Sequence, residues 1–409
     1  MKKYSLLPLL CLSFYANADT NILSTKEITS IQEDETKTYV KCWYRTDDSH
    51  DQAATDWEWA LKENGNYYKL KGYWYSANDW NDIFYTETTK SEIQERCEAT
   101  LALDASFADI TYFAADSSFS HNHNVWTNEA AEQSNSINKI VSFGDSISDT
   151  GNFYNFSQEI FPNDSTWFLG HFSNGFVWTE YLAKSLDLPL YTWAIGGAAG
   201  EDQYVIIKGI TGQIETYLEQ VQVAQNYQPQ NTLVTLEVGL NDFVSYDRTV
   251  AAVSEDLEQA IDLLMDNGIE NVLFLNLIDA STAPQFKYAS DEDIEKVQKR
   301  IEKFNTFIDE LVPELQAQGL NISLYDTESF FEQIITTPEN FGLHNVTDSC
   351  LDINENSSIN YLQTHALRDD CALNGSDSYL FWGVSHPTTK IHEIIAEDVF
   401  NNALESFTF

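Results

Sequence analysis

The chain has 409 residues, with 64 aspartates and glutamates against 22 lysines and arginines, and its formal net charge is −42 at pH 7. This length is sufficient for two or three domains. The acidity excludes nucleic acid as a partner, because phosphate binding needs a basic surface, and it opposes capture by anionic lipid; nothing in the sequence implies a protein partner.

Residues 1–18 have the composition of a secretory signal peptide. Two lysines near the start are followed by an apolar run and then by Ala-Asn-Ala at residues 16–18, the small-residue pattern of a cleavage site. We expect removal after Ala18, so the mature protein is predicted to be secreted. No later stretch has the roughly 18 consecutive apolar residues of a membrane span.

Residues 19–135 are predicted to form a small aromatic-rich N-terminal domain, α+β or rich in strands. Patches such as residues 66–75 favour strands, because aromatic side chains suit pleated surfaces. The tryptophans either fill a core or form a face that docks on a membrane or micelle, and the sequence leaves both readings open. Residues 117–136 indicate a linker. His121 and His123 within it lack cysteine or carboxylate partners, so we predict no metal site.

The cysteines outside the signal peptide are Cys42, Cys97, Cys350 and Cys371. In an oxidising compartment four cysteines indicate two disulfides, for which three pairings are compatible. We favour the two local pairs, Cys42 with Cys97 and Cys350 with Cys371, because each lies within one predicted domain.

Strand and helix patterns alternate through residues 136–409. Apolar runs typical of buried parallel strands lie at residues 137–143, 190–194, 232–238, 271–278 and 321–326. Helical patterns lie at residues 176–186, 210–224, 254–266, 291–311 and 391–404. This alternation predicts the α/β class, as a three-layer α/β/α sandwich with a parallel sheet of about five strands.

Residues 337–381 interrupt the alternation with clusters of Asn and Asp and little periodicity. A long irregular segment in a compact domain is usually functional or disordered, and the two cysteines here argue against disorder. Because the segment immediately precedes the last motif described below, we expect this insertion to lie near the active site.

A serine motif follows the first apolar run. Residues 143–152 read Phe-Gly-Asp-Ser-Ile-Ser-Asp-Thr-Gly-Asn, and their turn chemistry places Ser146 just beyond a strand, at the sheet edge where α/β proteins bind ligands. The nucleophile elbow Gly-x-Ser-x-Gly is excluded, since Ser148 occupies its last position. The string resembles the first sequence block of the GDSL, or SGNH, hydrolase family.

Three later strings resemble the other blocks of that family. They are Trp-Ala-Ile-Gly-Gly-Ala at 193–198, Gly-Leu-Asn-Asp at 239–242 and Trp-Gly-Val-Ser-His-Pro-Thr at 382–388. The resemblance implies a catalytic Ser146 with His386 as its base. It also implies an oxyanion hole made by the backbone N–H groups of Ser146 and Gly197 and the side-chain amide of Asn241. The resemblance covers about residues 137–409, and within the family it is strongest to the secreted thermolabile-haemolysin type of bacterial phospholipase.

The residue chemistry agrees with this resemblance. Acyl transfer needs a nucleophile, a base and donors directed at the oxyanion, and groups at successive parallel strand ends converge on one edge. We expect a serine lipolytic hydrolase that cleaves carboxylic esters of phospholipids, as a phospholipase A or lysophospholipase, through an acyl-enzyme and without a cofactor. The alternatives are a short-chain or carbohydrate esterase, because the blocks do not fix the acyl chain, and a catalytically weakened binding protein.

The binding-protein alternative rests on Gly383, which stands where the family's Asp-x-x-His block has its aspartate. In a serine protease, changing that aspartate to asparagine lowers kcat about 10⁴-fold. If the chain is an active enzyme, we expect a water, a backbone carbonyl or a small anion such as chloride beside Nδ1 of His386. A second departure is His171, at a position where arginine is expected.

Overall fold

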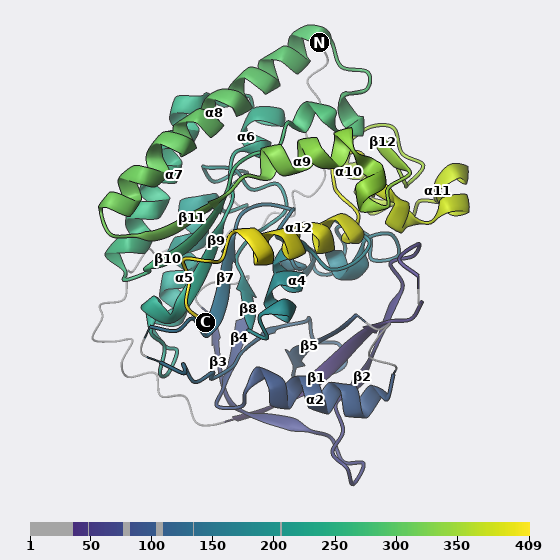
Figure 1. Ribbon diagram of the computed structural model, residues 1–409. Coiled ribbons are helices and arrows are strands. Elements are labelled where there is room, and N and C mark those ends of the chain that lie inside the picture. Colours follow the sequence, from purple (N-terminus) through teal and green to yellow (C-terminus); the bar gives the residue numbers. More distant parts are fainter. Residues whose placement is uncertain (1–35, 48, 77–81, 104–108, 134, 205–206) are drawn as a thin grey trace.

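The computed structural model describes residues 36–409 except 48, 77–81, 104–108, 134 and 205–206 (Figure 1). The predicted signal peptide, residues 1–18, lies outside the described residues. The described chain forms two main sheets, one in each of the two regions that the sequence distinguishes. No helix among these residues is both long enough and apolar enough to cross a bilayer.

The N-terminal region is built on a six-stranded sheet in which β2-β1-β3-β4-β6 follow one another and β5 pairs with β1. Its elements are β1 (Thr36–Arg45), β2 (Thr55–Trp59), β3 (Lys69–Ser76), β4 (Asp82–Thr86), α2 (Lys90–Leu101), β5 (Ile110–Ala115) and β6 (Asn124–Trp126). The disulfide between Cys42 and Cys97 joins β1 to α2. The expected α+β domain is therefore present.

One expectation for this region was wrong. Residues 117–136 contain β6, which pairs in parallel with β4, so they are not simply a linker. The polar flanks of this stretch conceal Val125 and Trp126, which are 5% and 4% exposed. Trp126 stacks on Tyr191 of the second region with ring centroids 4.1 Å apart. A tryptophan of the first region thus fills the core between the two.

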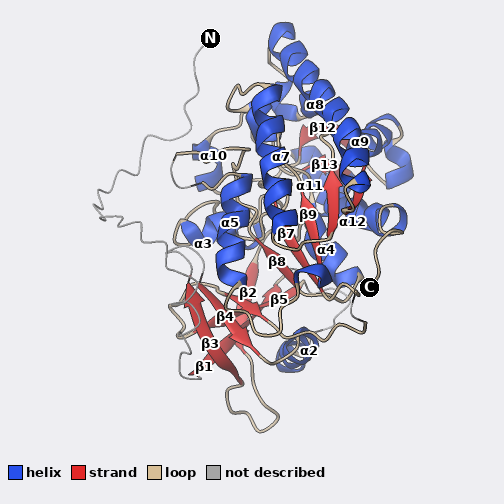
Figure 2. Cartoon of the chain, turned by 90° about the vertical axis from the view of Figure 1, so that its left-hand side faces the viewer, coloured by secondary structure: helices blue, strands red, loops and turns tan. Residues whose placement is uncertain are grey.

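The second region holds the predicted five-stranded sheet, in the order β11-β10-β9-β7-β8 and parallel throughout. Its strands are β7 (Lys139–Phe143), β8 (Leu190–Thr192), β9 (Thr232–Leu236), β10 (Asn271–Leu275) and β11 (Asn321–Tyr325). Helices lie on both sides of the sheet, which confirms the three-layer sandwich (Figure 2). They are α4 (Trp178–Ser185), α5 (Ile210–Val221), α7 (Val250–Asp266), α8 (Asp291–Ala317), α9 (Thr327–Thr336) and α12 (Thr389–Asn402).

Alternate residues of each strand supply the two cores. On β7, Ile140 packs with residues of α4, α9 and α12, whereas Val141 and Phe143 pack with residues of α5, α7 and α8. Successive side chains of a strand point to opposite faces, and both faces of this sheet are covered. The sequences of these strands are therefore mostly apolar, without a regular alternation of polar residues.

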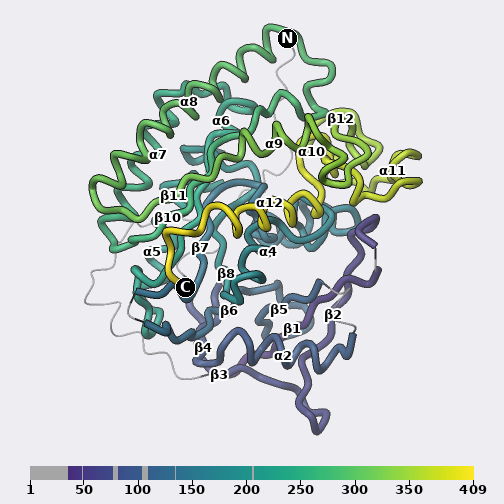
Figure 3. The backbone as a smooth tube through the Cα atoms, viewed as in Figure 1, coloured from purple at the N-terminus to yellow at the C-terminus, as the bar shows by residue number. Residues whose placement is uncertain are grey.

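Residues 337–381 form short elements held together by the disulfide between Cys350 and Cys371. They are β12 (Asn345–Ser349), α10 (Ser358–Leu362), α11 (Asp369–Asn374) and β13 (Tyr379–Phe381), with β12 and β13 paired in parallel. Both local disulfide pairings that the sequence favours are thus present. Figure 3 shows this segment, in yellow-green, at the edge of the second region beside the N-terminal end of α12.

Candidate active site

The three predicted turn residues follow the carboxyl ends of neighbouring strands. Ser146 follows β7, Gly197 follows β8 and Asn241 follows β9 at the start of α6 (Leu240–Val244). The chain leaves β7 for β8 on one side and returns to β9 on the other, so the site lies at the point where the strand order reverses. This is where open α/β sheets bind ligands.

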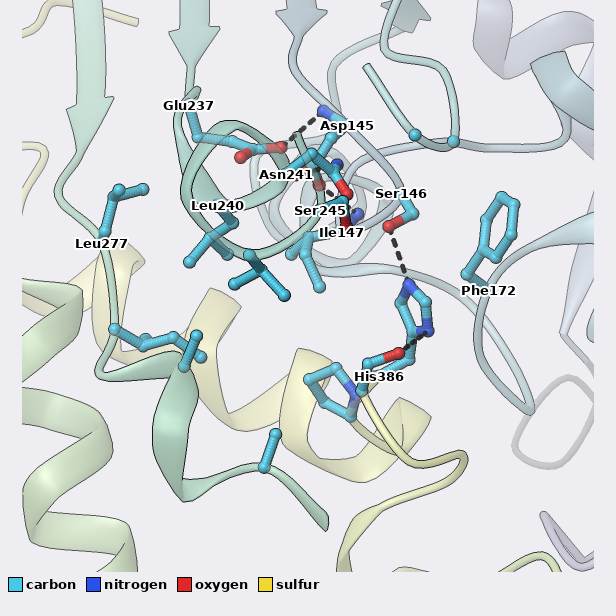
Figure 4. A pocket seen from close by; sticks show the side chains of 18 of the residues that line it. Asp145, Ser146, Ile147, Phe172, Glu237, Leu240, Asn241, Ser245, Leu277 and His386 are labelled. Atoms are coloured by element: carbon cyan, nitrogen blue, oxygen red, sulfur yellow. Dashed lines mark hydrogen bonds between the residues drawn. The ribbon is translucent and has the colours of Figure 1, made fainter. Parts of the chain in front are cut away.

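Ser146 and His386 form the contact at the centre of the site. Ser146 Oγ lies 2.7 Å from His386 Nε2 (Figure 4). The histidine lies in a tight turn after β13, in which the Trp382 N–H donates to the His386 carbonyl at 2.9 Å. Ser146 and His386 are 9% and 8% exposed, so their contact is shielded from water but accessible to a ligand.

The other imidazole nitrogen, Nδ1, contacts hydroxyl groups. The Tyr361 hydroxyl and the Ser385 hydroxyl each lie 3.1 Å from it. With Nδ1 protonated, Nε2 is left to accept the serine proton. Burial lowers the pKa of His386 to about 3, and no neighbouring charge offsets that effect. The imidazole is therefore neutral near pH 7, as a general base must be.

An aspartate is excluded at position 383 by Trp167. A Cβ at Gly383 would lie 2.8 Å from Cη2 of this tryptophan, closer than real Cβ contacts. Trp167 is 1% exposed and its ring packs against Tyr361 with centroids 4.9 Å apart. The indole ring therefore occupies the space that a side chain at position 383 would need.

The side-chain amide of Asn241 lies in the site and donates two hydrogen bonds to protein groups. Its Nδ2 donates to Asp145 Oδ2 at 2.9 Å and to the Ala198 carbonyl at 3.0 Å. Gly197 has φ +81°, a conformation that favours glycine, and its carbonyl accepts the Tyr246 hydroxyl at 2.8 Å. Both residues line the cavity that contains Ser146.

A buried pair of carboxyl groups, which the sequence analysis missed, holds the serine turn. Glu237 Oε1 accepts the backbone N–H of Asp145 at 2.7 Å (Figure 4). Burial raises the pKa of Asp145 to about 6, and burial together with Asp145 raises that of Glu237 well above its usual range. The pair therefore holds a proton near neutral pH. A Cβ at Gly144 would lie 2.3 Å from Glu237 Oε1, which explains the glycine.

Two further polar side chains fix the neighbouring backbone. Gln213 of α5 accepts the N–H of Gly144 at 3.0 Å and donates to its carbonyl at 2.9 Å. Asp149 accepts the N–H of Gly196 at 2.7 Å, which ties the serine loop to the glycine loop after β8. These bonds satisfy backbone groups that the tight turns leave unpaired.

The N-terminal region contributes a bond to the histidine side of the site. Arg45, 4% exposed, donates from Nη2 to the Asn174 carbonyl at 2.7 Å. Asn174 Oδ1 in turn accepts the N–H of Thr389 at 2.7 Å, three residues after His386. The preceding Ser173 hydroxyl donates to the Pro387 carbonyl at 2.9 Å. A chain of hydrogen bonds thus runs from β1 to the turn that holds His386.

His171, the other departure from the family pattern, is buried away from the serine. Its Nε2 lies 2.9 Å from Glu180 Oε2 of α4. Burial lowers its pKa, but the Glu180 carboxylate more than offsets this, so the net pKa lies above the usual value. The pair joins the loop to α4.

The cavity at the site has a volume of about 180 Å³. Ser146, His386 and Asn241 lie at its wall, and most of the remaining lining is apolar. The apolar side chains include Phe153, Phe161, Phe172, Ile207, Leu240, Val244, Leu277, Ile278 and Phe331. An apolar cavity with few convergent polar groups is the usual form of a site for a mostly apolar ligand.

Comparisons with known proteins agree with this geometry. The model of the family described as GDSL-like lipase/acylhydrolase matches residues 140–399, and that of the Vibrio dual lipase/transferase N-terminal domain matches residues 12–128. A thermolabile hemolysin of Vibrio parahaemolyticus is 50% identical over 95% of this chain and 93% of its own length. A phosphatidylcholine-sterol acyltransferase of Aeromonas hydrophila is 24% identical over 66% of this chain and 91% of its own.

Among solved structures, an acetyl xylan esterase matches 64% of this chain and 98% of its own length at 16% identity, with a TM-score of 0.33. A two-domain carbohydrate esterase from Corynascus matches 91% of this chain and 88% of its own at 11% identity, with a TM-score of 0.39. Scores this low support no inference about substrate.

Proposed function

Because the chain belongs to the GDSL-like lipase/acylhydrolase family, we propose that it is a secreted serine hydrolase that cleaves carboxylic esters of phospholipids through an acyl-enzyme on Ser146. The observation that carries the proposal is the 2.7 Å contact between Ser146 Oγ and His386 Nε2 at the wall of an apolar cavity. A nucleophile within hydrogen-bond reach of a base is the arrangement that acyl transfer requires.

The reaction begins with a neutral His386. As Ser146 Oγ attacks the ester carbonyl, Nε2 takes the serine proton and then gives it to the departing alcohol, which leaves an acyl group on the serine. Water then attacks the acyl-enzyme, losing its proton to the same nitrogen. The Tyr361 and Ser385 hydroxyls, each 3.1 Å from Nδ1, hold the ring in the required orientation.

The oxyanion is stabilised by three donors in this proposal, namely the N–H groups of Ser146 and Gly197 and the amide of Asn241. Asn241 donates to Asp145 and to Ala198 in the free protein, so one of these bonds is exchanged for the oxyanion. One such donor is worth about 2.7–4 kcal/mol in the transition state.

We also propose that a chloride ion or a water lies beside His386 Nδ1. The groups that meet there suit either one, because the Tyr361 and Ser385 hydroxyls, each 3.1 Å from Nδ1, can donate hydrogen bonds to a water or an anion. The indole N–H of Trp167 is also buried without a hydrogen-bond partner among the described residues. An anion stabilises the imidazolium electrostatically. Replacing chloride by a larger, weakly coordinating anion at constant ionic strength is expected to lower kcat, and an unchanged kcat would exclude the ion.

The test of the main proposal is fatty acid release from phosphatidylcholine vesicles by the full chain in chloride buffer. Release is expected from wild type and from Ser165→Ala, a control at an exposed serine, but not from Ser146→Ala. A series of soluble esters from acetyl to long acyl chains distinguishes a lipase from a short-chain or carbohydrate esterase. Inactivity on vesicles and on every soluble ester would instead support the binding-protein alternative.

A second outcome of the same acyl-enzyme is transfer to an alcohol in the lipid. This candidate is favoured by the match to the Vibrio dual lipase/transferase N-terminal domain and by the similarity to a phosphatidylcholine-sterol acyltransferase. It needs no further residue, because an alcohol replaces water in the second step. Vesicles that contain cholesterol distinguish the outcomes, since transfer yields a steryl ester and hydrolysis yields only fatty acid.

A further inference from the structure

The short helix α10 has one side in the cavity and the other in solvent. Tyr361 faces inward, is 7% exposed and reaches His386. Ile359 and Leu362 are 62% and 46% exposed. A helix turns about 100° per residue, so Ile359 points away from Tyr361 and Leu362 points to the side. The helix therefore presents aliphatic side chains to solvent directly behind a residue of the catalytic site.

The loop of residues 157–163 repeats this arrangement beside α10. Phe161 lines the cavity and its ring lies 5.5 Å from that of Tyr361, while the preceding Ile160 is 54% exposed. The Asn163 N–H donates to the Tyr361 carbonyl at 2.8 Å, which fastens the loop to the helix. In Figure 2 the loop's neighbour α3 (Asn152–Phe156) and α10 lie on the same side of the molecule.

α10 and the loop after β10 are joined at the cavity wall. Asn356, just before α10, is exposed and also lines the cavity, and its Nδ2 donates to Gln285 Oε1 at 3.1 Å. Ile160, Ile359 and Leu362 therefore lie within two residues of Phe161 or Tyr361, which line the cavity. Exposed apolar residues gathered around a ligand site mark an interaction surface.

The charge pattern identifies what this surface meets. Residues 356–367, Asn-Ser-Ser-Ile-Asn-Tyr-Leu-Gln-Thr-His-Ala-Leu, contain no Asp, Glu, Lys or Arg, although the whole chain has a formal charge of −42. An uncharged segment loses no ionic hydration when it enters a lipid headgroup layer, whereas the charge of the chain opposes approach to anionic lipid. Residues 157–163 carry one charged side chain, Glu159, whose Oε1 lies 3.4 Å from His121 Nδ1. The pattern therefore suits an electrically neutral interface rather than an anionic one.

We propose that α10 and residues 157–163 form a docking face for zwitterionic lipid, with Ile160, Ile359 and Leu362 entering the headgroup layer. The inference rests on the proposed phospholipid substrate, because docking serves a substrate that resides in the lipid surface. Docking brings the cavity mouth against the bilayer, so a lipid reaches Ser146 without crossing water. Ile359 and Leu362 flank Tyr361, whose hydroxyl contacts His386 Nδ1, so the docked lipid surface lies next to a residue that contacts the histidine.

The experiment measures vesicle binding separately from catalysis. Ile359→Asp and the milder Ile359→Ser are compared with Leu373→Asp, a control at an 83% exposed leucine on α11 of the same insertion. Sedimentation with phosphatidylcholine vesicles is measured in the Ser146→Ala background, and hydrolysis of a soluble ester in the active one. We expect Ile359→Asp to weaken vesicle binding at least about tenfold, Ile359→Ser by less, and Leu373→Asp not at all. Rates on the soluble ester are expected to stay unchanged.

Three other results would overturn the inference. Equal affinities of the Ile359→Asp and Leu373→Asp variants for phosphatidylcholine vesicles would show that the lipid binds elsewhere on the protein. Tighter binding to phosphatidylglycerol than to phosphatidylcholine would exclude a neutral interface. Absence of binding and lipid hydrolysis in wild type, with the soluble ester still cleaved, would overturn the phospholipid proposal together with this one. Hydrogen exchange on Ser146→Ala tests the face without altering it, because vesicles should protect residues 157–163 and 356–363 and leave α11 unprotected.

Discussion

Restoring the family's aspartate by Gly383→Asp is expected to impair this protein. The new Cβ would lie 2.8 Å from Cη2 of Trp167, about 0.7 Å or more inside a normal carbon contact. Trp167 is packed against Tyr361 and is almost fully buried, so it yields only by disturbing the residue that orients His386. Overpacking of this kind costs about 1–3 kcal/mol of folding free energy. A displacement of about 1 Å at a catalytic group lowers the rate about 10²-fold.

The assay pairs kcat/KM on a soluble ester with thermal unfolding. Gly383→Ala carries the same Cβ without the carboxylate, so we expect both variants to lose stability and activity. Adding Trp167→Ala to Gly383→Asp removes the clash and is expected to restore part of kcat/KM, a non-additivity typical of residues in contact. A Gly383→Asp protein with wild-type Tm and equal or higher kcat/KM would refute the steric argument, because the site would then accommodate the aspartate.

Three other predictions follow from the contacts of the site. Asn241→Ala is expected to lower kcat about 10²–10³-fold with little change in KM; an equal kcat would exclude it from the oxyanion hole. Arg45→Lys keeps the charge but loses the planar guanidinium that hydrogen-bonds to Asn174 and Asp109. We therefore expect kcat to fall while the fold is retained. An unaltered kcat would show that the N-terminal region does not position His386. A carboxyl group whose pKa is raised on folding stabilises the folded state while it is protonated. This stabilisation is lost as the pH rises from about 4 through about 6 for Asp145, and at higher pH for Glu237. The Tm of Glu237→Gln should therefore fall less than that of wild type over this range, and parallel curves would contradict the shared proton.

The sheet was predictable because its chemistry is local. The runs at residues 232–238 and 271–278 are mostly apolar, since both faces of the strand are covered. Helix boundaries were less accurate. The structure continues α8 through Pro313 to Ala317, because a proline removes one helical hydrogen bond while the buried Leu315 still packs against the sheet. The helix α9 was missed, although its buried Phe330 and Ile334 are four residues apart.

The site was predictable only where residues lie in short motifs. Ser146, Gly197, Asn241 and His386 line one cavity as the motifs imply. Trp167 reaches the site from an irregular segment and Tyr361 from the short helix α10. No sequence pattern assigns either residue to the site. Glu237 did carry a signal, because an acid inside an otherwise apolar strand needs a buried partner.

The most direct test of the account is covalent capture of the nucleophile. The wild-type protein is treated with a long-chain alkyl fluorophosphonate, and intact mass and peptide mapping follow the product. We predict one adduct per chain on Ser146, absent from Ser146→Ala and much slower in His386→Ala. An adduct on another residue, or equal labelling of Ser146→Ala, would contradict the serine mechanism.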